Sequence, residues 1–137
     1  EIWNLAVICS VGSCSAEEVD EYGIVLATKK AMLRAIADSI RQPDFLLVDA
    51  LDLPEAKIPF ESIIKGDRKS RSIAAASIVA KVSRDMEMSN ISSLYAGYGF
   101  ERNKGYGTRE HMIALSEKGP SPIHRRSFAP VSKAMKS

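Results

Sequence analysis

Apolar runs separated by polar and turn-forming stretches predict alternating strands and helices along this 137-residue chain. Trp3 to Cys9 is a short, β-branched apolar run, which is typical of a buried strand. The sequence Ser15-Ala-Glu-Glu18 predicts a helix start, because its hydroxyl and carboxylate can satisfy free amides of the first turn. Apolar residues at helical spacing then predict one buried stripe to about residue 40, ended by Pro43. The stripe comprises Val19, Tyr22, Leu26, Leu33, Ile36 and Ile40.

Two compact apolar runs in the middle of the chain each end close to an acidic residue. The first is Asp44 to Asp49, and the second is Phe60 to Lys65, which Gly66 and Asp67 follow. Both patterns predict central strands. The connection between them contains Pro54 and Pro59, which favour a loop or a short irregular turn.

The second half is predicted to be mostly helical. Ser70 to about Tyr95 contains neither Pro nor Gly, which indicates a long helix opened by Ser70 or Ser72. A glycine-rich loop reaches Gly107, a last helix opens at Thr108 and ends before Gly119, and the tail from Ser121 is expected to be irregular. This alternation predicts an α/β sandwich around a central sheet, within a single domain, and leaves the strand directions open.

Composition excludes a membrane span and places the chain among cytoplasmic proteins. The longest apolar stretches, such as Phe45 to Val48 and Ile73 to Val82, fall far short of the roughly 20 residues that a bilayer requires. The chain starts without a recognisable export signal. Cys9 and Cys14 lack a second pair or a nearby His at zinc spacing, so we expect reduced thiols.

The net charge of +2 conceals a marked asymmetry. Residues 1–62 hold 5 basic and 11 acidic residues, whereas residues 63–100 carry a net +3 and residues 101–137 a net +5. A basic half suits a polyanionic partner, since Lys and Arg that neutralise phosphates release counterions. The alternative is a solvated basic face without a ligand.

Asp49 and Asp67 are the candidate metal ligands. Each follows an apolar strand, at the sheet edge where ligand sites form if the two strands run parallel. Carboxylate oxygens suit Mg²⁺ or Mn²⁺, and a pair of such ions can stabilise both the attacking and the leaving oxygen in phosphodiester cleavage. The alternative is that each Asp only caps a turn.

Candidate phosphate and base contacts lie on both sides of the long helix. Four cations gather near its start and beside Asp67, where free amides and the helix dipole could also bind phosphate. The glycine-rich loop combines aromatic rings and cations suited to stacking on nucleic acid. His111 is expected to be a structural hydrogen-bonding residue and not a general base. The four cations are Lys65, Arg68, Lys69 and Arg71, and the loop residues are Tyr98, Arg102, Lys104 and Tyr106.

Several motifs, in their order and spacing from about Val11 to Val131, resemble bacterial ribonuclease HII. They are Leu47-Val-Asp49, Lys65-Gly-Asp67, the segment from Ala75 to Asp85, Tyr98-Gly-Phe100, Asn103-Lys-Gly-Tyr106, and His124-Arg-Arg-Ser-Phe128 followed by Pro130.

The resemblance implies a ribonuclease H-like α/β sandwich, with a central mixed sheet flanked by helices. It implies an endoribonuclease that uses Mg²⁺ or Mn²⁺ to cut on the 5′ side of ribonucleotides in RNA–DNA hybrids or duplex DNA, leaving a 3′-hydroxyl. Asp49 and Asp67 match the third and fourth of the family's four metal-binding carboxylates, and Tyr106 matches its tyrosine at the ribose–DNA junction. Family positions near the substrate backbone are matched in this sequence by Lys65, Ser77, Lys81 and Lys104. Asp85 is expected to be structural.

The chain departs from the family pattern at its start. The family begins with an Asp-Glu-x-Gly-Arg-Gly segment that supplies two carboxylates, and this segment is absent from the 137 residues. We therefore expect a fold incomplete at its N-terminus, an isolated chain with little or no activity, and association with itself or with the absent segment. A non-catalytic nucleic-acid-binding remnant is the alternative. A nucleotide-binding protein is disfavoured, because no Gly-rich phosphate loop follows a strand.

Overall fold

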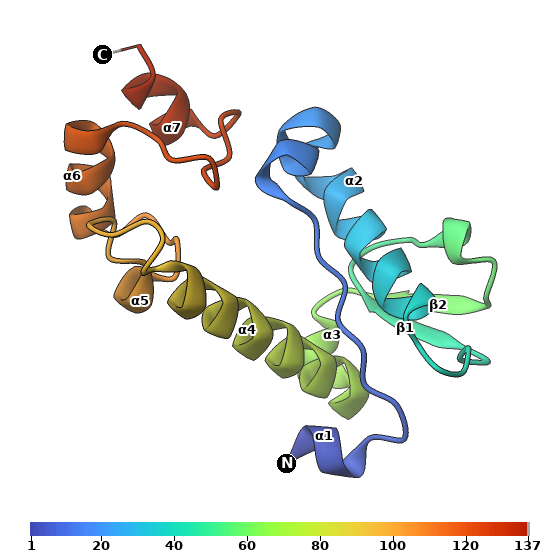
Figure 1. Cartoon of the computed structure of the whole chain (residues 1–137). Helices are drawn as coiled ribbons and strands as arrows, with labels where there is room; N and C mark the ends of the chain where they lie inside the picture. Colours follow the sequence, from blue (N-terminus) through green and yellow to red (C-terminus); the bar gives the residue numbers. More distant parts are fainter. Residues whose placement is uncertain (137) are drawn as a thin grey trace. The chain divides into compact units, whose positions relative to one another are not determined.

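The computed structural model describes residues 1–136, which form seven α-helices, one short 3₁₀ helix and two strands (Figure 1). In chain order these are α1 (Ile2–Leu5), α2 (Ala16–Ala37), β1 (Leu46–Asp49), η1 (Pro54–Ala56), β2 (Phe60–Ile63), α3 (Gly66–Lys69), α4 (Arg71–Ile91), α5 (Phe100–Asn103), α6 (Arg109–Lys118) and α7 (Ala129–Ala134). The chain divides into two compact units. The first comprises residues 1–14 and 25–81, and the second comprises residues 15–24 and those from 82 onward.

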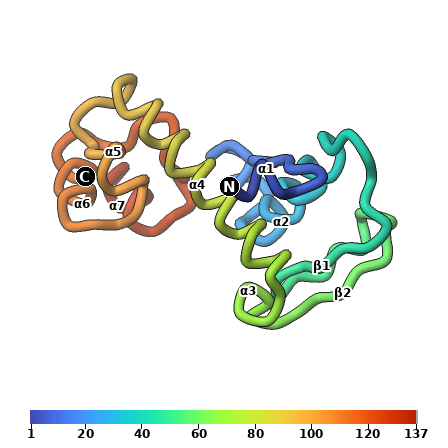
Figure 2. Tube along the Cα trace, turned by 90° about the horizontal axis from the view of Figure 1, so that it is seen from below, coloured from blue at the N-terminus to red at the C-terminus, as the bar shows by residue number. Residues whose placement is uncertain are grey.

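The first unit contains the sheet, which is one parallel pair of strands. Leu46 of β1 aligns with Phe60 of β2, and Asp49 aligns with Ile63. Both strands lie within the predicted runs, and α3 follows at the end where they terminate (Figure 2). The strand direction, which the sequence left open, is parallel. Leu53 is 1% exposed and anchors the connection before the short turn η1.

The prediction of a strand from Trp3 to Cys9 is wrong. Residues 2–5 form α1, and the following segment runs beside α2, where the Ser10 hydroxyl donates to the Ala35 carbonyl (2.6 Å). The Cys14 thiol donates to the Ala27 carbonyl at 3.2 Å. A strand requires a ladder with a neighbour. Within residues 1–136 the sheet holds only β1 and β2, so this apolar run has no ladder to join.

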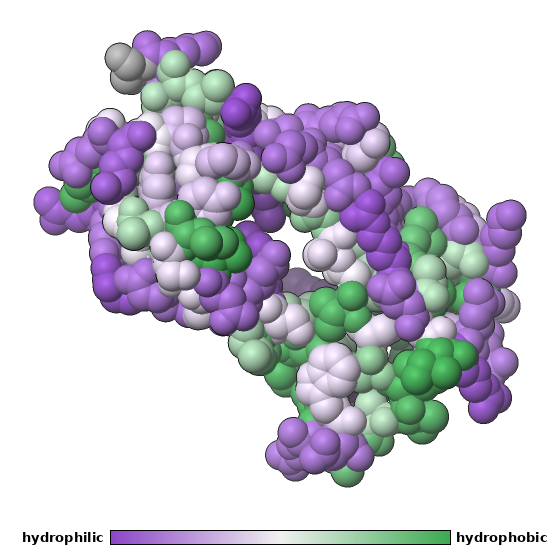
Figure 3. All heavy atoms as spheres, viewed as in Figure 1, coloured by the Kyte–Doolittle hydropathy of each residue, from purple (hydrophilic) through white to green (hydrophobic). Residues whose placement is uncertain are grey.

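Gly12 allows the N-terminal segment to lie directly on α2. A Cβ at this position would overlap the backbone carbonyl of Ala31 and lie 2.6 Å from the amide nitrogen of Ala35. Only glycine, which has no Cβ, therefore allows the backbone at position 12 to lie this close to the backbone of α2. Farther toward the N-terminus, Leu5 is 77% and Val7 is 95% exposed, and hydrophobic side chains reach the surface in patches (Figure 3).

Helix α2 begins as predicted but is not continuous. The Ser15 amide donates to the Glu18 carboxylate (2.9 Å) and the Glu18 amide to the Ser15 hydroxyl (3.2 Å), so the capping box is confirmed. Gly23 then leaves the helical region, with φ 76° and ψ 160°. The single buried stripe is therefore wrong, because the helix is interrupted at Gly23 and α2 ends before Ile40. Val19 is buried, whereas Ile40 is 96% exposed.

The second unit has an aromatic core. The cluster consists of Met88, Tyr98, Phe100 and Ala114, and the rings of Tyr98 and Phe100 stack at 5.4 Å. Helix α6 begins at its predicted cap, where the Thr108 hydroxyl accepts from the His111 amide. The glycine-rich loop before it includes the short helix α5.

The prediction that the whole tail from Ser121 is irregular is wrong in part. Residues 129–134 form α7, with Pro130 in its first turn and Val131 buried. Pro suits this position because the first turn needs no amide donor there, and burial of Val131 supplies the tertiary contact. Of the helices in the described chain, none combines the length and apolar character that a bilayer span demands.

Candidate metal and nucleic-acid site

Asp49 and the Gly66–Asp67 turn meet at the carboxyl end of the parallel strands. Asp49 is the last residue of β1, and its Oδ1 accepts a hydrogen bond from the Gly66 amide at 2.7 Å. Asp67 is the next residue and lies in the first turn of α3. The Asp49 carboxylate is thus bonded to the residue adjacent to Asp67, at the edge where ligand sites form in parallel sheets.

The backbone next to each partner of the Asp49–Gly66 hydrogen bond is strained. Ala50, directly after Asp49, has φ 53°, and Lys65, directly before Gly66, has φ 56°. This left-handed region costs a non-glycine residue roughly 1–2 kcal/mol, and such strain tends to cluster at ligand-binding sites. Two strained residues therefore hold the turn that brings Asp49 and Gly66 together.

The donor chemistry of the turn suits a hard divalent cation. The bond from Gly66 uses one lone pair of Asp49, so the carboxylate retains acceptor capacity, and Asp67 is exposed. Oxygen ligands of this kind suit Mg²⁺ or Mn²⁺, which keep several waters and take few protein ligands. Across residues 1–136 no three His, Cys, Asp or Glu side chains are grouped so that they could hold an ion.

The other predicted contacts of the first unit lie on exposed surface. Lys65 is exposed at the N-cap of α3. Ser77 and Lys81 are exposed on α4, where residues four apart lie on the same face. The Ser77 hydroxyl donates to the Ala74 carbonyl at 2.8 Å.

Lys104 and Tyr106 belong to the second unit. The Tyr106 side chain is 63% exposed, while its backbone carbonyl accepts from the Thr108 amide (2.8 Å) and bonds Nδ1 of His111 (2.9 Å). The Lys104 ammonium donates to the Ser89 hydroxyl and, at 2.6 Å, to the Glu101 carbonyl. The Tyr106 ring is therefore exposed to solvent, whereas the Lys104 ammonium already donates hydrogen bonds within the second unit.

A buried histidine pair is the feature that the sequence did not reveal. Nε2 of His111 and Nε2 of His124 lie 3.0 Å apart, and the two residues are 4% and 7% exposed. Burial, with the neighbouring His111, lowers the pKa of His124 despite the hydrogen bond from Ser121. His111 is a structural hydrogen-bonding residue, as predicted. The pairing of His111 with His124 could not be predicted, because the two histidines are thirteen positions apart in the sequence. This spacing is not one that is typical of a metal site.

The lowered pKa of His124 predicts that mild acid destabilises the chain. The unfolded chain, with an ordinary His pKa of 6.5, binds more protons than the folded chain. The free energy of unfolding should therefore be highest above pH 6.5 and fall as the pH drops through the folded pKa. Urea unfolding at pH 7.5, 6.5 and 5.5 measures this trend. A His124→Asn variant, which can still accept from the Ser121 amide, should show a weaker slope, and an equal slope would contradict the assignment.

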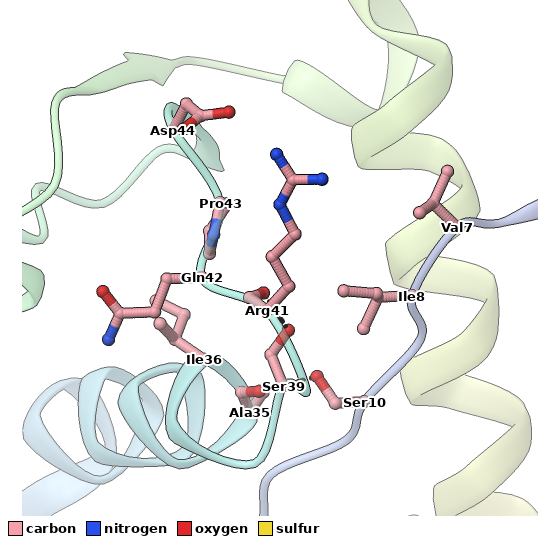
Figure 4. A pocket seen from close by; sticks show the side chains of 10 residues that line it. All are labelled: Val7, Ile8, Ser10, Ala35, Ile36, Ser39, Arg41, Gln42, Pro43 and Asp44. Atoms are coloured by element: carbon pink, nitrogen blue, oxygen red, sulfur yellow. Dashed lines mark hydrogen bonds between the residues drawn. The ribbon is translucent and has the colours of Figure 1, made fainter.

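A hollow lies within each unit. In the first, a space of about 470 Å³ lies between the N-terminal segment, with Ile8 and Ser10, and the end of α2, with the Arg41 side chain between them (Figure 4). None of the predicted site residues lines it. In the second, about 530 Å³ is bordered by Tyr106, both histidines and three cations. The cations are Arg84, Lys104 and Arg125.

Comparison with known proteins agrees with the resemblance in the motifs. The sequence pattern of the Ribonuclease HII family matches residues 6–131. The chain is 55% identical over 135 residues to ribonuclease HII of Desulfitobacterium hafniense strain DCB-2, and 51% identical over 129 residues to that of Chlamydia caviae. The crystal structure of ribonuclease H2 from Pyrococcus horikoshii superposes with a TM-score of 0.72 at 21% identity, covering 89% of this chain and 65% of that one.

The fold and the family follow from these matches. The structural match, with helices and a small parallel sheet, confirms the predicted ribonuclease H-like α/β fold. The described strands form a parallel pair, whereas the resemblance implied a mixed sheet. The alignments cover 98% and 94% of this chain, but only 52% and 60% of the two bacterial relatives, so the chain spans little more than half their length. The chain belongs to the ribonuclease HII family.

Proposed function

We propose that this chain contributes part of the active centre of an endoribonuclease. The substrate is an RNA–DNA hybrid or duplex DNA with embedded ribonucleotides, and the cut falls on the 5′ side of the ribonucleotide. The observation that carries the proposal is the bond from the Gly66 amide to the Asp49 carboxylate, because Gly66 directly precedes Asp67 in the chain. Family membership supports the reaction class.

Asp49 and Asp67 act in this proposal as metal ligands. Two Mg²⁺ or Mn²⁺ ions, when bound, stabilise the attacking and the leaving oxygen of the phosphodiester. The Gly66 amide holds the Asp49 side chain in place, so the carboxylate need not reorganise when an ion arrives. Asp67 is exposed, so its carboxylate is open to a hydrated ion.

The remaining predicted residues bind the nucleic acid. Lys65, Ser77, Lys81 and Lys104 contact the substrate backbone, and Tyr106 stacks at the ribose–DNA junction. The family pattern runs through both compact units, which supports treating residues 1–137 as one ribonuclease HII-like domain. The proposed location of this protein is the cytoplasm.

The isolated polypeptide is proposed to cleave poorly or not at all. The resemblance implies four metal-binding carboxylates, and this polypeptide offers two of them, Asp49 and Asp67. The second candidate function, a nucleic-acid-binding remnant, is favoured by the +5 charge of residues 101–137. Both proposals predict binding to nucleic acid, and only the first predicts cleavage once the ligand set is complete.

Cleavage of a labelled duplex with one embedded ribonucleotide separates the two. We would compare the 137-residue chain with a chimera, in which the part of the Desulfitobacterium hafniense ribonuclease HII that this chain does not cover is joined to it. With Mg²⁺ or Mn²⁺ the chimera should cut on the 5′ side, while the chain alone binds without efficient cutting. A folded chimera that binds but never cleaves would favour the remnant, and efficient cutting by the chain alone would refute the proposed inactivity.

A further inference from the structure

A chain of three hydrogen bonds links the buried interior of the second unit to the backbone of Tyr106. The Ser121 amide donates to Nδ1 of His124 at 3.0 Å, and the Ser121 hydroxyl, 2.8 Å from the same nitrogen, is able to donate to it as well. Nε2 of His124 lies 3.0 Å from Nε2 of His111, and Nδ1 of His111 lies 2.9 Å from the Tyr106 carbonyl oxygen. Both ends of this relay are backbone groups with one fixed role, a donor at Ser121 and an acceptor at Tyr106.

These fixed ends determine where the protons reside. Because the Ser121 amide can only donate, Nδ1 of His124 accepts, and a neutral His124 carries its proton on Nε2. Because the Tyr106 carbonyl can only accept, Nδ1 of His111 carries the proton of that ring. Nε2 of His111 is then an acceptor that receives the proton of His124. All three hydrogen bonds can therefore form when both rings are neutral, with the proton of His111 on Nδ1 and the proton of His124 on Nε2.

The surroundings keep the two rings in place. The His111 ring meets Phe100 edge-on at 5.3 Å, and His124 lies 5.0 Å from the Tyr98 ring. Besides Tyr106 and the two histidines, the titratable side chains that border the same hollow are Arg84, Lys104 and Arg125, and none of the described residues that border it is an Asp or a Glu. A second proton on either ring would break a bond of the relay with no carboxylate there to offset the added charge.

The Tyr106 loop is also fixed on its N-terminal side. The buried Asn103 accepts from the Gly105 amide (2.8 Å) and donates to the Tyr98 carbonyl (2.6 Å), and its backbone carbonyl accepts from the Tyr106 amide (2.8 Å). Tyr106 thus has both its backbone amide and its carbonyl bonded to ordered groups, while its ring is exposed. This is the arrangement expected of a side chain held ready for a ligand.

We propose that His111 and His124 are positioning residues for Tyr106, acting through this tautomer-fixed relay to hold the ring where nucleic acid stacks on it. The inference rests on the proposed function, because it requires Tyr106 to contact the substrate. His111 reaches the Tyr106 backbone directly, and His124 acts through His111 by fixing its tautomer.

Two substitutions of His111 separate positioning from simple packing. His111→Asn places an amide nitrogen near the former Nδ1, so the bond to the Tyr106 carbonyl survives and the one to His124 is lost. His111→Gln places its amide near the former Nε2, so the bond to His124 survives and the one to Tyr106 is lost. Both remove the ring from the same core and should lower stability to a similar extent, which urea unfolding measures.

Binding of the full chain to a fluorescent duplex with one embedded ribonucleotide is measured by anisotropy at pH 7.5 without divalent metal. Tyr106→Ala should weaken binding about tenfold. His111→Gln should weaken it about threefold or more, and His111→Asn less than twofold. In the Tyr106→Ala background, His111→Gln should add nothing, because the two changes act through one group.

The outcomes separate the two proposals. If Tyr106→Ala leaves binding unchanged, Tyr106 is not a substrate contact, and the proposed function loses that residue together with this inference. If Tyr106→Ala weakens binding but the Gln and Asn variants of His111 behave alike, the inference alone is overturned. Nitrogen-15 NMR of the unsubstituted chain gives an independent test. The relay requires a proton on Nδ1 of His111 and on Nε2 of His124, and either opposite tautomer would overturn it.

Discussion

Asp49→Asn and Asp67→Asn should each lower the rate of ribonucleotide cleavage by the chimera on the order of 10²–10³-fold, as expected when a group that stabilises transition-state charge is removed. Asn retains an oxygen that can accept from the Gly66 amide, so the turn after β1 should survive the change at position 49. The loss therefore reports the missing charge and not a disrupted strand. Single-turnover cleavage over a range of Mn²⁺ concentrations measures the effect.

Asp52→Asn is the matched control for these variants. Asp52 is exposed and lies three residues beyond Asp49, so it undergoes the same loss of charge outside the proposed ligand set. Its cleavage rate should stay within about twofold of the unsubstituted chimera. Binding of the duplex without metal should be unchanged or slightly tighter in all three variants, because each loses one negative charge. Full cleavage by either Asp49→Asn or Asp67→Asn would remove that residue from the metal site.

Local signals in the sequence predicted the elements that carry the candidate site. The capping box at Ser15, the cap at Thr108 and the two apolar runs ending near Asp49 and Asp67 are each complete within a few residues. Physical chemistry that acts over such short distances can be read from one sequence. The parallel pairing of β1 and β2 also agrees with the idea that both acids occur at one sheet edge.

Features that depend on distant partners could not be predicted in this way. The run from Trp3 to Cys9 has strand composition, but the part of the chain that the structure describes offers it no ladder, and it lies on α2 instead. Gly23 breaks α2 although the apolar spacing continues past it. His111 and His124 are paired in contact with Ser121 and with the rings of the aromatic core. In each case tertiary contacts override or complete the local pattern.

Phe100→Ala should lower the free energy of unfolding by about 3–5 kcal/mol, the range for removing a buried phenylalanine from a core. Phe100 is 2% exposed, and its ring stacks on Tyr98 and lies 5.3 Å from His111 and 5.6 Å from His124. Its removal leaves a cavity and removes the ring contact that Phe100 makes with each of the two histidines. A loss of this size is a large part of the stability of an ordinary domain, so urea unfolding at pH 7.5 should detect it readily.

Phe45→Ala provides the comparison, because the same atoms are removed from a side chain that is 53% exposed. Its effect on unfolding should be within about 0.5 kcal/mol, as for most surface substitutions. Phe100→Ala should also weaken duplex binding under conditions where most molecules remain folded, since the relay to Tyr106 depends on the placement of His111 and His124. If Phe100→Ala destabilised the chain by less than about 1 kcal/mol, the aromatic cluster would not be the core of this unit, and the rigidity attributed to the Tyr106 loop would lack its physical basis.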